Sequence, residues 1–255
     1  MSDPFDLTGD TALVVGAAAG GLGARAALTL GRRGARVLVA DLPSRADDLD
    51  RTVDSLVSAG ASVEALTCDV TDESSVAEAV GHAGRLDVLV NAAGVMLRKP
   101  VAETTVEEFE RVLRVNLTGA WLLGRAAGAR MTAQRGGRIV NFATVYAERV
   151  GPVPESAYYS SKAGVANLTR SMASEFGTAG VRVNCLALGV FYPTNMTAPL
   201  ADAPETLAWF SDRTLLKRLG DPETDLDGPL LLLASPAGSY VTGQVIYADG
   251  GWSAW

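Results

Sequence analysis

The sequence predicts an α/β protein built on one doubly wound parallel sheet of about seven strands, with helices on both faces. Short apolar, β-rich runs alternate with longer helical stretches along the whole chain. The short runs are apolar almost without interruption, which is typical of parallel strands covered on both faces. No internal repeat breaks the alternation. We therefore expect one domain over residues 1–255.

The predicted elements follow one another in a regular order. The predicted strands are 11–15, 36–41, 63–68, 86–90, 138–143, 181–188 and 244–249. The predicted helices are 22–34, 46–60, 72–84, 105–137 and 156–180, each with glycine near its end. Residues 191–221 form the longest interruption. We expect them to be a lid over the carboxyl ends of the strands, where such sheets bind ligands; the alternative is a surface excursion packed on the core.

Composition excludes several classes of function. The net charge is -7 and no block of lysines or arginines occurs, which argues against nucleic acid or an anionic membrane as the main partner. The chain has neither a secretory leader pattern nor a run of about 18 apolar residues, so we expect a cytoplasmic protein. Cys68 and Cys185 offer no disulfide framework or metal cluster. His82, the only histidine, is expected at the surface, and no metal site is predicted.

A glycine-rich turn follows the first predicted strand and leads into a helix. Glycines let the backbone approach a pyrophosphate that rests on the helix N-terminus. Asp41 closes the second strand, where a carboxylate accepts hydrogen bonds from the adenosine ribose and repels a 2′-phosphate. The pattern therefore predicts a Rossmann-type site for NAD rather than NADP, although nearby arginines favour the opposite choice. The glycines are Gly16, Gly20, Gly21 and Gly23, and the arginines are Arg32, Arg33 and Arg45.

A wider set of motifs lies along the chain in a fixed order: "CDVTD", "VNAAG", "VNLTG", "YYSSK", "VRVN" and "SYVTGQVIYADGG". Together with the glycine-rich turn, this set resembles the short-chain dehydrogenase/reductase family over essentially the whole length. The resemblance implies that Asp69 contacts adenine, that Asn91 and Gly94 line the cofactor cleft, and that Val190 follows the nicotinamide side. It also assigns to the cofactor site Leu22, Leu42, Val70, Ala92, Tyr158, Lys162, Gly189 and Thr194.

The chain departs from the family's pattern in two loops, and the helix between "CDVTD" and "RLDVLV" is about one turn shorter than in that pattern. The turn Thr-Gly-x-x-x-Gly-x-Gly reads "VGAAAGGLG", so Val15 replaces threonine and either the loop is one residue longer or the glycines are shifted. After the sixth strand the usual Pro-Gly reads Leu188-Gly189, and "VFYPTNM" carries one extra residue before Thr194.

Tyr158 and Lys162 lie four residues apart, so a helix makes them neighbours. A phenol with a pKa of about 10 is a poor base near neutrality, but an adjacent ammonium group favours the phenolate. The resemblance implies that Tyr158 is the acid/base of hydride transfer between an alcohol and nicotinamide, and that Lys162 also binds the nicotinamide ribose. It further implies that Asn116 holds a water in the proton relay and that Thr144, in place of the usual serine, bonds the substrate oxygen.

The segments "LRKP", "AWFSDRTLLKRLGDPE" and "QVIYADGGWSAW" are similar to the branch of the family that includes gluconate 5-dehydrogenase and related sugar-acid dehydrogenases. That similarity implies a sugar acid or polyol as substrate. Arg98 and Arg149 would then grip a carboxylate, with Tyr192 as a further substrate contact.

Two alternatives stay open. One is a ketoreductase or alcohol dehydrogenase for a more apolar secondary alcohol, favoured by Val95, Met96, Phe191, Tyr192 and Trp209. The other is an NAD-binding protein without turnover. The family resemblance also implies a homotetramer, and the apolar "GWSAW" at the carboxyl end would suit an intersubunit surface.

Overall fold

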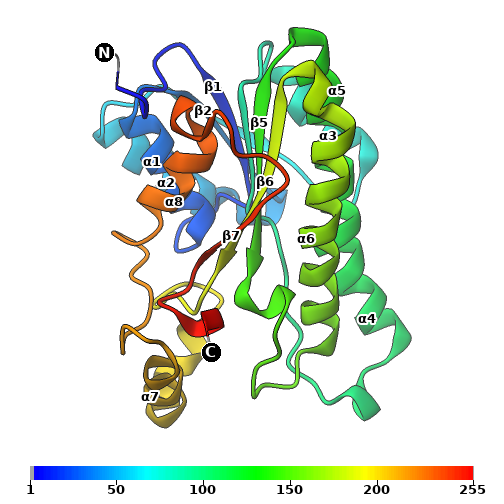
Figure 1. Cartoon of the computed structure of the whole chain (residues 1–255), viewed down its shortest axis with the longest axis vertical. Helices are drawn as coiled ribbons and strands as arrows, with labels where there is room; N and C mark the ends of the chain where they lie inside the picture. The colour runs from blue at the N-terminus through cyan, green and yellow to red at the C-terminus, as the bar shows by residue number, and fades with distance from the viewer. Residues whose placement is uncertain (1–2, 255) are drawn as a thin grey trace.

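The sheet has seven parallel strands in the order β3-β2-β1-β4-β5-β6-β7, in a computed structural model that describes residues 3–254 (Figure 1). The direction of winding reverses between β1 and β4, which opens the crevice where ligands bind in this architecture. The strands are β1 Thr11–Val15, β2 Arg36–Asp41, β3 Val63–Thr67, β4 Val88–Asn91, β5 Gly137–Thr144, β6 Val181–Leu188 and β7 Val245–Ala248.

Helices cover both faces of the sheet, with α1, α2 and α8 on one side and α3, α5 and α6 on the other (Figure 1). Alternate strand residues face opposite layers, so Val14 packs with the first group of buried side chains and Leu13 with the second. This two-sided burial explains the nearly continuous apolar runs and confirms the predicted fold class. The helices are α1 Leu22–Arg32, α2 Ala46–Ser58, α3 Glu73–His82, α4 Val106–Leu113, α5 Gly119–Gln134, α6 Ser156–Phe176, α7 Pro204–Arg213 and α8 Asp227–Ala234.

Two helical regions differ from the sequence prediction. The single helix predicted over 105–137 is α4 and α5 joined by a π-helical turn, Arg114–Thr118, in which the N–H of Gly119 bonds to the carbonyl of Arg114. Helix α8 was not predicted. Its start is fixed by the buried Arg25 of α1, whose Nε donates to Asp227 Oδ1 at 3.0 Å.

The 191–221 segment lies at the carboxyl ends of the strands and contains α7 (Figure 1). A β-bridge between Phe191 and Gly220 closes its base. Trp252 packs against Phe210 of α7 and Tyr146, with ring centroids 5.9 Å apart in both pairs. Only 3% of Trp252 is exposed, so this ring of "GWSAW" packs inside the chain. Trp255 of the same motif, like Met1 and Ser2 of the predicted domain, lies outside the described residues.

Within residues 3–254, none of the helices combines the length and the apolar character that crossing a membrane requires. The same residues contain no group of three or more acidic, histidine or cysteine side chains placed to hold a metal ion. His82 ends α3 at the surface, as predicted, with Nε2 2.5 Å from Glu64 Oε1.

Candidate active site

The glycine-rich turn between β1 and α1 is shaped for close approach. Gly16 and Gly20 have φ angles of +82° and +81°, a region that favours glycine. A Cβ on Gly23 would lie 2.1 Å from the carbonyl oxygen of Gly16, so helix and strand touch there. Gly16 and Gly23 are one position further apart than the outer glycines of the family's turn. We conclude that the loop is longer by one residue.

The N-terminus of α1 is open to an anion. Its N-cap, Gly21, supplies no side-chain cap, and Leu22 begins the helix with no acidic residue in the first turn. Free N–H groups at such a terminus bind phosphate well. The turn therefore fits the pyrophosphate of a dinucleotide.

Polar side chains end β2 and β4 and follow β3 at the same edge of the sheet. Asp41 accepts hydrogen bonds from the N–H of Ala18 at 2.8 Å and of Leu42 at 2.9 Å. Asp69, which precedes Val70, is turned to its own loop and accepts two bonds from Thr71, both at 2.8 Å. Asn91, before Ala92, is buried with Oδ1 3.3 Å from the N–H of Ala93.

The three arginines that favoured NADP stand in different places. Arg45 donates through Nε to Asp48 at 2.7 Å. Arg32 and Arg33 lie at the far end of α1, where Arg33 pairs with Asp3 at 3.3 Å. Only Arg45 is near Asp41 in the chain, and it is paired with Asp48, a carboxylate that it shares with Arg51.

Tyr158 and Lys162 are adjacent and buried on α6, each 6% exposed. Lys162 Nζ donates to the carbonyl of Phe142 on β5 at 2.8 Å and lies 5.9 Å from the centroid of the Tyr158 ring. Burial lowers the pKa of Lys162 to about 8. Burial also raises the pKa of Tyr158, and the charge of Glu155 raises it further. The direction for Tyr158 is opposite to the one expected from the lysine alone, because desolvation is the largest effect.

Asn116 stands in the π-helical turn and ties three segments together. Its Oδ1 accepts from the N–H of Val95 at 2.8 Å, and its Nδ2 donates to the Val95 carbonyl at 2.9 Å and to Ser161 Oγ at 3.0 Å. A Cβ on Gly94 would lie 3.4 Å from Asn116 Oδ1 and 3.5 Å from Lys162 Nζ. The structure therefore brings Asn116, Gly94 and Lys162 together. Sequence reasoning missed Ser161, although "YSSK" contains it.

Thr144 ends β5, where its Oγ1 lies 3.4 Å from the N–H of Tyr146 and the residue is 7% exposed. Its position at the end of β5 places it at the same edge as Asn91 at the end of β4, since the two strands are parallel neighbours.

The 191–221 segment reaches the glycine-rich turn. The N–H of Asn195 donates to the carbonyl of Gly20 at 2.8 Å, and its Nδ2 donates to the carbonyl of Ala19 at 2.7 Å. Beside it, Thr194 Oγ1 lies 2.8 Å from Thr197 Oγ1. The two loops that depart from the family's pattern are thus in contact. Sequence reasoning did not find Asn195, because nothing local signals its partner.

The three candidate substrate residues differ in exposure and in hydrogen-bond partners. Arg98 Nε donates to Glu155 Oε1 at 2.9 Å, so its guanidinium is already paired with a buried carboxylate. Arg149 is exposed and its Nη1 donates to the carbonyl of Glu148 at 3.1 Å. Tyr192 is half-buried, and its N–H bonds to the carbonyl of Gly220.

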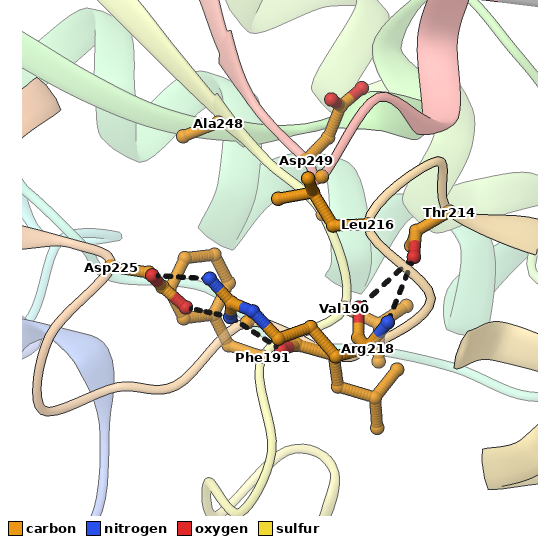
Figure 2. A pocket seen from close by; sticks show the side chains of 12 residues that line it. Val190, Phe191, Thr214, Leu216, Arg218, Asp225, Ala248 and Asp249 are labelled. Carbon is orange, nitrogen blue, oxygen red and sulfur yellow. Dashed lines mark hydrogen bonds and ion pairs between the residues drawn. The ribbon is translucent and has the colours of Figure 1, made fainter.

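A cavity of about 170 Å³ lies behind the loop that follows β6 (Figure 2). Gly189 and Val190 line one wall, and Arg218 crosses it to pair with Asp225, with Nη2 3.0 Å from Oδ1. None of the four candidate catalytic residues lines this cavity. The cavity therefore adjoins the predicted nicotinamide side through Val190 but does not contain the candidate catalytic residues.

These features together define a Rossmann-type oxidoreductase that uses a nicotinamide cofactor. A family model described as enoyl-(acyl carrier protein) reductase matches residues 16–253. The chain belongs to the short-chain dehydrogenase/reductase family, as its motifs predicted.

Relatives of known activity are similar over almost the entire chain. The cis-4-hydroxycyclohexanecarboxylate dehydrogenase of Sinomonas cyclohexanicum is 40% identical over 94% of this chain and 96% of its own length. The L-tagatose-forming galactitol 2-dehydrogenase of Cereibacter sphaeroides is 36% identical over 98% of both chains. The crystal structure of a gluconate 5-dehydrogenase from Burkholderia cenocepacia, in complex with NADP and tartrate, is 28% identical with a TM-score of 0.92, covering 99% of this chain and 98% of its own.

Proposed function

We propose that this protein is an NAD(H)-dependent oxidoreductase that interconverts a secondary alcohol and a ketone, with a sugar acid or a polyol as substrate. The observation that carries the proposal is the meeting of Lys162 and Asn116 at Gly94, beside Tyr158 and at the edge where the glycine-rich turn opens. Sugar-acid and polyol dehydrogenases among the similar proteins support the substrate class.

The bound nicotinamide supplies the hydride acceptor or donor. Tyr158 exchanges the proton with the alcohol oxygen, and the Thr144 hydroxyl bonds the same oxygen. Lys162, with a pKa of about 8, is mostly protonated near neutrality, and its ammonium group lies 5.9 Å from the centroid of the Tyr158 ring, where a positive charge favours the phenolate. Asn116 fixes the chain at Val95 and Ser161, which keeps the cleft in shape.

Asp41 supports NAD over NADP, because its carboxylate is held at the end of β2 where the adenosine ribose would lie. A 2′-phosphate there would meet a fixed negative charge. We expect kcat/KM with NAD to exceed that with NADP by at least about tenfold. Asp41→Asn should bring the kcat/KM values with NAD and with NADP closer together. A preference of the native protein for NADP would contradict the proposed role of Asp41.

The decisive experiment for turnover is Tyr158→Phe, measured by NADH absorbance with galactitol, gluconate and 2-butanol. The variant should keep NAD binding and lose nearly all turnover. Tyr240→Phe is the matched control, because Tyr240 is fully exposed at 102% relative accessibility. Native-like activity in Tyr158→Phe would refute the role.

The 191–221 segment is proposed as the lid of this site, supported by its bonds from Asn195 to the glycine-rich turn.

We also propose a homotetramer. Trp121 on α5 is 43% exposed, and β7 is an edge strand with half-buried residues, so both have apolar surface to cover. Sedimentation velocity of the native protein tests the assembly, and a monomer would contradict it.

A further inference from the structure

Glu155 is a buried carboxyl beside the proposed acid/base that the reaction above does not use. It is 4% exposed, comparable to Tyr158 and Thr144, and it stands directly before α6, three residues ahead of Tyr158. Arg98 binds it through Nε at 2.9 Å, and Arg98 Nη2 lies 3.5 Å from the carbonyl of Met196 in the 191–221 segment. The pair therefore links the site to its proposed lid.

This ion pair weakens the ability of Arg98 to bind a substrate carboxylate. The charge of the guanidinium is balanced by a carboxylate in contact with it, and this carboxylate is buried. A substrate carboxylate placed there would approach Glu155 as well as Arg98, and a buried like charge opposes it. Arg98 is consequently a poor anchor for an anion while Glu155 holds it.

Tyr146 provides the second observation. The residue is 8% exposed, and its hydroxyl oxygen is buried with no hydrogen-bond partner among residues 3–254. Its ring lies 5.0 Å from that of Tyr159, centroid to centroid. The N–H of Tyr159 in turn donates to the carbonyl of Glu155 at 2.9 Å, so the aromatic ring beside Tyr146 is bonded to the residue that carries the carboxylate. Burial raises the pKa of Tyr146. An unsatisfied buried hydroxyl is costly, and a ligand that bonds it recovers the cost.

A substrate hydroxyl complements both groups. It donates a hydrogen bond to the carboxylate of Glu155 and accepts one from the hydroxyl of Tyr146. A carboxylate can accept from Tyr146 but has no proton for Glu155. The two residues therefore discriminate by hydrogen-bond polarity and by charge.

We propose that Glu155 and Tyr146 bind a substrate hydroxyl away from the reacting carbon, and that Glu155, by holding Arg98, makes the enzyme select a neutral polyol over the aldonate of the same carbon skeleton. This inference rests on the proposed function and narrows its substrate class.

The test compares D-glucitol with D-gluconate, which share a carbon skeleton and differ at one terminus. The native enzyme is expected to have the higher kcat/KM for glucitol. Glu155→Gln removes the charge at almost constant shape. It should lower the ratio of kcat/KM for glucitol to kcat/KM for gluconate by about tenfold or more, mainly through the KM values of the two substrates. Glu175→Gln is the matched control, since Glu175 is exposed at the other end of α6. It should leave the ratio unchanged, and the Kd for NAD should be the same in all three proteins.

Tyr146→Phe is the second variant, and it breaks no hydrogen bond within the described chain. It should raise KM for glucitol about fivefold and leave 2-butanol, which has a single hydroxyl, unaffected. This variant keeps the inference falsifiable if Glu155→Gln fails to fold.

Several results would overturn the inference while the oxidoreductase stands. They are a native preference for gluconate, an unchanged ratio in Glu155→Gln, an equal effect of Tyr146→Phe on both alcohols, or native turnover of 2-butanol alone. No NADH formation with any alcohol would overturn the proposed function and this inference together.

Discussion

Asn195 fastens the 191–221 segment to the glycine-rich turn, and its replacement by alanine should weaken NAD binding. The substitution removes the bond from Nδ2 to Ala19 at 2.7 Å and keeps the bond from the main-chain N–H to Gly20 at 2.8 Å. A neutral hydrogen bond contributes about 1 kcal/mol net, which corresponds to about a fivefold change in an equilibrium. We therefore expect the Kd for NAD to rise about fivefold while kcat changes little.

Intrinsic fluorescence measures this directly, because Trp209 lies on α7 within the segment and 5.5 Å from Trp252 by ring centroids. Native protein and Asn195→Ala are titrated with NAD under identical conditions. Gln244→Ala is the control, since it removes a similar exposed amide bond, to Thr242 at 2.9 Å. The reasoning is refuted if the two variants have the same Kd, or if the Kd of Asn195→Ala stays within about twofold of the native value.

Three further outcomes are expected. Gly23→Ala should lower the free energy of unfolding in urea by about 2 kcal/mol, since its Cβ would lie 2.1 Å from Gly16 O; an unchanged value would contradict the packing. Trp252→Ala should lower the free energy of unfolding by about 3 kcal/mol in the same assay, because the ring is 3% exposed. A loss below about 0.5 kcal/mol, which is typical of an exposed residue, would count against its burial. Burial lowers the pKa of Lys162 from 10.5 to about 8, so the unfolded chain binds more protons between these values and the native protein gains stability as pH rises through them. The stability of Lys162→Met relative to native should then fall by about 2 kcal/mol from about pH 7 to about pH 9.5, whereas a constant difference would disprove the shift.

The strands and most helices were predictable because burial on both faces leaves a local signature. Val88 to Asn91 and Val181 to Leu188 are mostly apolar runs, and the sheet buries nearly all of their residues. Helix α8 was missed because its apolar "LLLL" run has no helical period, and Arg25 from a distant helix fixes its start.

The candidate site divides in the same way. The spacing of Tyr158 and Lys162 on one helix is local, so the sequence revealed it. Glu155, Tyr146 and Asn195 were missed, because each matters through a partner remote in the chain or through the lack of one. Pairings of this kind depend on how loops meet after folding, and no periodicity encodes them.

The π-helical turn that carries Asn116 has a consequence for how the helix pair tolerates change. A turn of this kind holds one residue more than a regular α-helical turn. Deleting a single residue between Arg114 and Thr118 would convert it to ordinary helix and improve the local hydrogen bonding, yet it would swing Asn116 by roughly 100° away from Val95 and Ser161. The length of this stretch is therefore a requirement separate from its composition, and we expect a chain shortened here to lose the bonds of Asn116 to Val95 and Ser161.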